Sequence, residues 1–241
     1  MRRRPRNDYE LAPDVIKKVP WFRRRLLRWF GGSSRSFPWR EPGRTPYEVL
    51  VAEVMLQRTV AANVARVYPA FLAKYPDFAA LSRAEPGELE EILKPLGLWR
   101  LKAHIFRRLA EAIAERGGEV PATRDELERL ESVGQYTASV VLNTVHGIPE
   151  PFVDVNMARV LERFFGPRTY FDVRDDPYLH TLSRRVVEGG DSLQANWAVL
   201  DFSALVCRAK RPLCEQCPVR ARCDYFNGPR NPDMAALRAE K

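Results

Sequence analysis

The four cysteines of the chain all lie in one short basic stretch, at Cys207, Cys214, Cys217 and Cys223. Four thiolates on a compact loop can hold a [4Fe-4S] cluster, with one thiolate on each iron. A structural zinc site also takes four thiolates, but usually as two separated Cys-x2-Cys pairs, and this stretch has one such pair. Two disulfides would need an oxidising compartment, and the basic residues after Met1 do not resemble a signal segment. The spacing therefore favours an iron–sulfur cluster.

Two carboxyl groups stand where they could do acid–base chemistry. Glu53 interrupts an otherwise apolar run, residues 49–56, so burial should raise its pKa and let it act as a general acid. The alternative is a structural glutamate paired with an arginine. Asp154 follows an extended segment with two prolines and precedes a helical pattern. It could cap that helix, serve as a catalytic carboxylate, or do both.

A glycine turn joins two helical patterns at residues 130–138. We expect Gly134 either to approach another group closely or to adopt a positive φ. The helix beginning at Gln135 would then present free N–H groups, which suit a phosphate. A tight turn without a ligand is the alternative. Gln57 and Arg58 directly follow the buried run around Glu53 and suggest a second ligand-facing surface.

The charge balance favours a polyanionic partner. The net charge is +8 and the pI about 9.5, and four arginines lie among the first six residues, at Arg2, Arg3, Arg4 and Arg6. Nucleic acid is the most common partner of such a chain, although a merely basic protein has the same composition. No long uninterrupted apolar window indicates a membrane span, so we expect no membrane association.

Helices must position these side chains. Apolar residues recur at helical spacing between Gly and Pro breaks, and alternating β-branched runs are scarce, so the sequence predicts an all-α fold. An amphipathic helix with a basic face should end in the segment 31–34, Gly-Gly-Ser-Ser. Further helices are expected at 46–75, 84–93, 100–116, 124–130, 136–146, 157–165, 176–188 and 197–206.

The hairpin, the aspartate after it and the cysteine loop together resemble the helix-hairpin-helix DNA glycosylases that carry an iron–sulfur cluster. The resemblance covers about residues 36–226. Within this superfamily, the segments 37–40, 53–57 and 153–156 are most similar to the MutY and Mig branches. The short stretch after Cys223 and the segment 201–204 resemble Mig, whereas 53–57 and 149–151 resemble MutY.

Two departures from the family pattern affect the expected chemistry. Glu131 and Ser132 stand where the family usually has Pro-Gly or Lys-Gly. Tyr136 occupies the position of the endonuclease III lysine that forms a Schiff base with the sugar. A phenol cannot form an imine, so efficient AP-lyase activity is not expected.

The resemblance implies two helical domains with the active site at their seam. One spans 45–152 and carries the hairpin; the other combines 1–44 with 153–241 and carries the cluster. The implied activity is that of a monofunctional DNA glycosylase of base excision repair, which hydrolyses the N-glycosidic bond of T or U mispaired with G. A MutY-like adenine glycosylase acting on A opposite G or 8-oxoguanine is one alternative. A non-catalytic iron–sulfur DNA-binding module is another.

The resemblance also assigns roles to individual residues. The expected catalytic residues are Asp154, Glu53, Tyr136 and Asn156. The expected DNA contacts are Gln57, Arg58, Ser132, Val133, Gly134, Gln135 and Thr137, and the four cysteines are the expected cluster ligands. We expect a monomer that binds double-stranded DNA with a mismatched or damaged base, in the cytoplasm at a prokaryotic-type nucleoid.

Overall fold

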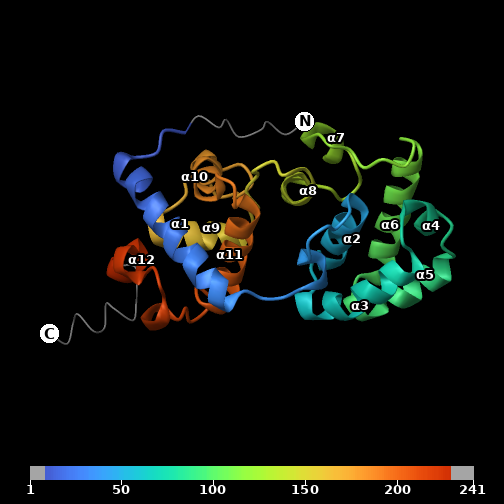
Figure 1. Ribbon diagram of the computed structural model, residues 1–241, viewed down its shortest axis with the longest axis horizontal. Coiled ribbons are helices and arrows are strands. Elements are labelled where there is room, and N and C mark those ends of the chain that lie inside the picture. The colour runs from blue at the N-terminus through green and yellow to red at the C-terminus, as the bar shows by residue number, and fades with distance from the viewer. Residues whose placement is uncertain (1–8, 229–241) are drawn as a thin grey trace. The chain divides into compact units, whose positions relative to one another are not determined.

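The computed structural model describes residues 9–228, which form helices joined by turns and contain no strand (Figure 1). This confirms the predicted all-α fold. The basic tail, Arg2 to Arg6, lies outside the described residues. Among the helices of the described chain, none is both long and apolar enough to cross a membrane.

Within the described residues the chain divides into two compact units. We call residues 36–148 the hairpin unit, and residues 9–35 together with 149–228 the cysteine unit. Glu53 and Tyr136 belong to the hairpin unit, whereas Asp154 and Asn156 belong to the cysteine unit.

The hairpin unit is built around α2, which packs against α3, α6 and α8, while α4 and α5 pack against α6. A capping box begins α2: Thr45 Oγ1 accepts from Glu48 N–H, and Glu48 Oε2 accepts from Thr45 N–H. The helices are α2 (Pro46–Leu56), α3 (Ala61–Lys74), α4 (Phe78–Ser82), α5 (Pro86–Leu93), α6 (Trp99–Ala114), α7 (Arg124–Leu127) and α8 (Gln135–His146), with 3-10 turns η1 (Pro38–Arg40) and η2 (Lys94–Leu96).

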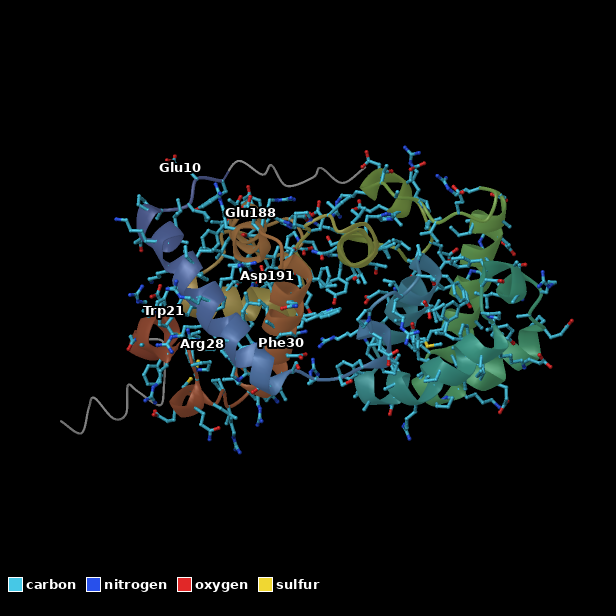
Figure 2. The ribbon with its side chains drawn as sticks, in the orientation of Figure 1. Glu10, Trp21, Arg28, Phe30, Glu188 and Asp191 are labelled. Carbon is cyan, nitrogen blue, oxygen red and sulfur yellow. The ribbon has the colours of Figure 1, made fainter. Side chains whose placement is uncertain are left out.

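The cysteine unit packs α1 against α10 and α11, and α9 against α10, α11 and α12 (Figure 1). Phe22 of α1 meets Phe164 of α9 with ring centroids 4.6 Å apart. Figure 2 labels Trp21 and Arg28 on the same helix. The helices are α1 (Pro13–Ser33), α9 (Val155–Phe165), α10 (Pro177–Val187), α11 (Ser192–Leu205) and α12 (Asp224–Asn227), with 3-10 turns η3 (Cys214–Gln216) and η4 (Arg220–Arg222).

Several predicted helices differ from the structure: α4 was not expected, α7 ends at Leu127 rather than at 130, and α11 begins at Ser192 rather than at 197. The helix expected over 46–75 is two helices, because residues 57–60 leave the helical path and Arg58 has a φ of +55°. Helix α1 ends at Ser33, within the expected segment 31–34, so that Gly31 and Gly32 are both helical. Glycine costs a helix only about 1 kcal/mol per residue, which the packing of α1 against its neighbours outweighs.

Candidate active site and DNA-contacting turns

Asp154 is the N-cap of α9, as the extended, proline-containing segment before it predicted. Its Oδ1 accepts from the N–H groups of Asn156 at 2.9 Å and Met157 at 2.7 Å. Its Oδ2 accepts from Asn156 Nδ2 at 2.6 Å. The carboxyl group is therefore held at both oxygens by the first turn of one helix, and Asn156 contacts both oxygens.

The surroundings of Asp154 pull its pKa in opposite directions. Burial raises the pKa of this carboxyl above its ordinary value, while the hydrogen bonds from Met157 and Asn156 act to lower it. The N-terminus of a helix also favours a negative charge. A carboxylate has about four acceptor positions. The donors of the described chain fill three of them, which leaves room for a hydrogen bond from a water molecule.

Glu53 lies in the middle of α2, where every residue from Val49 to Met55 is buried. Its side chain is 8% exposed, and burial raises its pKa to about 8, with a smaller opposing effect of Arg40. Within residues 9–228 its carboxyl group makes no hydrogen bond or ion pair, and the arginine that acts on its pKa is Arg40. Near pH 7 the group is a neutral acid that can donate a hydrogen bond.

The hairpin turn departs from its prediction at Gly134. Gly134 has a φ of −94°, and no heavy atom lies within 4 Å of where a Cβ would stand. The expectation of a positive φ at this glycine is therefore wrong, and Gly134 makes no close approach to other atoms of the described chain. The left-handed conformation falls on Ser132 instead, at a φ of +63°. Such a φ costs a non-glycine residue roughly 1–2 kcal/mol.

The predicted DNA contacts of the hairpin differ in accessibility. Val133 is buried and its N–H donates to Leu130 O at 3.2 Å, and the Thr137 side chain is also buried. The N–H groups of Ser132 and Gly134 make no hydrogen bond within the described chain. Helix α8 begins at Gln135, as predicted, and Tyr136 lies in its first turn. The hairpin thus offers backbone donors more than side chains.

Three turns of the hairpin unit are joined by hydrogen bonds, and we call residues 57–59, 96–98 and 131–134 the linked turns. The Gln57 amide bonds to Ser132, and Thr59 Oγ1 donates to Leu96 O at 2.8 Å. Each turn contains a non-glycine residue with positive φ: Arg58, Leu98 and Ser132. Backbone strain of this kind concentrates at functional sites.

Lys102 was missed by the sequence reasoning. Its side chain is 2% exposed, and its Nζ donates to Val54 O at 3.0 Å and to Gln57 O at 2.7 Å. It thereby caps the last carbonyls of α2, and burial lowers its pKa to about 8. A signal was present, because Lys102 stands at the start of the apolar stripe that Ile105, Phe106 and Leu109 continue.

The four cysteines are free of disulfides and line one pocket of the cysteine unit. Burial raises the pKa of the Cys217 thiol to about 12, so four thiolates need a cation among them. Arg163 Nη1 contacts Cys207 Sγ at 3.5 Å. Most of the remaining lining is apolar, and Arg163 and Arg220 complete it; the apolar side chains include Phe22, Val160, Phe164, Phe202, Val206 and Leu213. The residues present fit a thiolate-bound cluster in an apolar cage.

The cysteine loop is attached to α1 and presents basic side chains. Lys18 Nζ contacts Asp224 at 2.6 Å, and the Arg222 guanidinium lies 4.9 Å from the Trp21 ring centroid. The basic side chains of the loop are all exposed: Arg208, Lys210, Arg211, Arg220 and Arg222. On α1, Arg24, Arg25 and Arg28 are exposed as well. This surface suits a polyanion.

The family model of the HhH-GPD superfamily base excision DNA repair proteins matches residues 51–174 of the chain, more than half of its length. The chain belongs to this superfamily. The match contains the second half of α2 with Glu53, the linked turns, the hairpin and Asp154. It confirms the resemblance inferred from the sequence, and with it the prediction of a DNA glycosylase enzyme.

Relatives of this HhH-GPD protein with thymine in their names cover nearly all of it. The thymine-DNA glycosylase of Aeropyrum pernix is 36% identical over 87% of the chain and 96% of its own length. The thymine/uracil-DNA glycosylase of Pyrobaculum aerophilum is 38% identical over 82% of the chain and 88% of its own length. A solved structure of a thermostable thymine-DNA glycosylase superimposes with a TM-score of 0.82 at 32% identity, covering 87% of this chain and 97% of that one.

The adenine glycosylase branch of the superfamily is also similar. Human adenine DNA glycosylase is 32% identical over 90% of the chain, but the chain spans only 41% of that protein. The alternative of an adenine glycosylase therefore has less support than the thymine/uracil one.

Proposed function

We propose that this HhH-GPD protein is a monofunctional DNA glycosylase that removes thymine or uracil mispaired with guanine. The observation that carries the proposal is the Asp154 carboxyl group, half-buried at the N-terminus of α9 and held by three hydrogen bonds. The names of the relatives that match most of the chain support the choice of base. The proposal requires Asp154 and Glu53 to act on the same extruded nucleotide.

Breaking the N-glycosidic bond develops positive charge on the sugar, and Asp154 supplies the opposing negative charge. Its remaining acceptor position can also orient the water that adds to the sugar carbon and loses a proton to the carboxylate. Asn156 keeps both oxygens in place through its 2.6 Å and 2.9 Å contacts. Tyr136 helps to position the water, and since a phenol forms no imine the strand stays intact.

Glu53 acts on the base rather than on the sugar. A neutral carboxylic acid can donate to a carbonyl oxygen of thymine or uracil, and that bond strengthens as the departing base gains negative charge. A pKa of about 8 keeps the proton on Glu53 at neutral pH. If the base were adenine, the same proton would protonate it as it leaves.

DNA binding combines phosphate contacts with extrusion of the target nucleotide. The N–H groups of Ser132 and Gly134, together with those that begin α8 at Gln135, suit a phosphate. The basic side chains of α1 and the cysteine loop add affinity without reading sequence. A mismatched base costs less to extrude, which favours damaged sites. We expect a monomer that works on the DNA of a prokaryotic-type nucleoid in the cytoplasm.

The proposal includes a [4Fe-4S] cluster on Cys207, Cys214, Cys217 and Cys223, because the superfamily includes iron–sulfur members and the four thiols share an apolar pocket. No group of three or more ligand side chains in residues 9–228 surrounds a single ion position. A cubane needs no such group, since each thiolate binds a different iron. When bound, the cluster would hold the loop in shape and take no part in bond cleavage.

The test is base release from labelled duplexes carrying T:G, U:G, A:G or A opposite 8-oxoguanine, each with and without alkali. Release of T and U opposite G, with strand breaks only after alkali, is the expected result. Release of adenine alone would favour the MutY-like activity instead. Strand breaks without alkali would contradict a monofunctional enzyme.

Asp154→Asn separates an enzyme from a DNA-binding module. Asparagine is as good an N-cap as aspartate, so the variant should fold and bind DNA normally. Base release should fall at least a thousandfold, since removal of a single electrostatic stabiliser costs about 10²–10³ and the charge here serves two roles. Equal base release by the variant and the wild type would refute a catalytic Asp154. If the wild type and the variant bind DNA equally well and the wild type releases no base from any duplex, the result would support the non-catalytic DNA-binding module.

A further inference from the structure

The Gln57 side chain and Ser132 form a closed pair of hydrogen bonds. Gln57 Nε2 donates to Ser132 O at 3.0 Å, and Ser132 Oγ donates to Gln57 Oε1 at 2.9 Å. Both ends of the amide are thus engaged, across 75 positions of sequence. One intramolecular hydrogen bond typically shifts the equilibrium between its formed and broken states by about two- to tenfold. The form in which both Gln57–Ser132 hydrogen bonds are broken is therefore a minor one.

The hydroxyl group is what distinguishes Ser132 from a glycine at the same position. A glycine would adopt the φ of +63° without strain, but it could not donate to Gln57. The turn therefore accepts a strained residue and gains one hydrogen bond to a side chain of the other turn. These two effects are similar in size, so the serine changes the rigidity of the turn more than its stability.

The backbone of Gln57 is fixed as firmly as its side chain. Lys102 donates to Gln57 O at 2.7 Å from the buried side of α6. Thr59, two residues later, donates to Leu96 O. Arg58 stands between these anchors with an exposed side chain that has no hydrogen bond or ion pair in the described chain. Hydrogen bonds thus fix both the side chain and the backbone carbonyl of Gln57, whereas none within the described chain fixes the side chain of Arg58.

We propose that Ser132 and Gln57 form a lock that joins the 57–59 turn to the hairpin, so that both turns meet the duplex as one preformed element. Gln57 is then a positioning residue, and contact with the bases at this turn falls to Arg58. A preformed element avoids the entropy cost of ordering two turns on binding. The inference deepens the proposed function and rests on it, since it takes both turns to be DNA-contacting.

The experiment compares Ser132→Gly, Gln57→Ala and the double variant on a U:G duplex with 2-aminopurine beside the uracil. Base extrusion is followed by fluorescence and base release by single-turnover kinetics. Each single variant should slow extrusion by about three- to tenfold, and the double variant should be no slower than either, because both remove the same unit. Arg58→Ala should slow extrusion more than Arg66→Ala, which removes an exposed arginine of α3 outside the linked turns.

Gln57 as a base-contacting residue would give a different pattern. Gln57→Ala would then cost far more than Ser132→Gly, and the two losses would multiply in the double variant. Faster extrusion by Ser132→Gly would mean that the lock must open before DNA is engaged. Any of these results overturns the proposal.

A readout without DNA keeps this inference separable from the proposed function. The side-chain amide protons of Gln57 should exchange with solvent several-fold faster in Ser132→Gly than in the wild type, as measured by NMR. Equal exchange in the two proteins would overturn the lock even if the enzyme releases uracil. If the Gln57 amide protons exchange slowly in the wild type but the wild type releases no base from any duplex, the proposed function is refuted. The role of the lock in DNA binding is then refuted with it.

Discussion

Replacement of Glu53 by glutamine should stabilise the protein relative to the wild type by an amount that grows as the pH rises. The pKa of Glu53 is raised from 4.5 to about 8 by burial. Below pH 4.5 both folded and unfolded states hold the proton. Between these values the folded state keeps a proton that the unfolded state releases, so stability falls as pH rises. Above pH 8 the folded protein carries a buried carboxylate and the full penalty.

The magnitude follows from the shift. Each pKa unit corresponds to about 1.4 kcal/mol, so the full penalty is about 5 kcal/mol. According to the linkage relation, roughly 3 kcal/mol of this loss in unfolding free energy occurs between about pH 5.5 and about pH 8.5. Glutamine has no proton to lose, so the unfolding free energy of Glu53→Gln should rise relative to wild type by about that amount across the range.

Denaturant unfolding of both proteins under anaerobic conditions at several pH values measures this difference. Contributions shared by the two proteins, including those of the cysteine loop, cancel in the comparison. Glu48→Gln in the same helix is the matched control. Burial raises the pKa of Glu48, but hydrogen bonds from Thr45 and Arg44 outweigh it and hold the pKa below 4.5. The difference in unfolding free energy between Glu48→Gln and the wild type should therefore stay constant above about pH 5.5.

A constant difference for Glu53→Gln over the same range would refute the reasoning, because it would mean that the carboxyl is already ionised at pH 5.5. Activity supplies a second check on the donor role. Base release by the wild type should decline above about pH 8 as Glu53 loses its proton, while Glu53→Gln keeps a donor and shows no decline there.

Three further variants test other parts of the site. Lys102→Met should lower the unfolding free energy by about 1–3 kcal/mol, measured by denaturation, because the Val54 and Gln57 carbonyls lose their shorter hydrogen bonds and keep only those from Gln57 N–H at 3.4 Å and Thr59 Oγ1 at 3.3 Å. Tyr136→Lys should create an adduct with abasic DNA that borohydride traps, because an amine can form the imine that a phenol cannot. Purified protein should contain iron and acid-labile sulfide in equal amounts, and Cys217→Ser should lower both; zinc in their place would contradict the cluster.

The sequence determined the features that depend on neighbouring residues. Four cysteines within one loop must share a site whatever the rest of the chain does. Asp154 caps α9 because prolines keep the residues before it extended and a helical pattern follows it. Glu53 is buried because its own helix is apolar on every face. In each case the spacing of residue types along a short segment was sufficient.

Tertiary structure alone decided the shape of the linked turns. The break between α2 and α3 carries no glycine or proline, and it is held by Thr59 and Lys102 through partners 37 and 45 positions away. The positive φ that the sequence predicted at Gly134 occurs at Ser132, whose carbonyl accepts a hydrogen bond from the Gln57 side chain. Hydrogen bonds between distant segments leave no periodic trace in the sequence. The residues that set the geometry of the linked turns therefore became visible only in the folded chain.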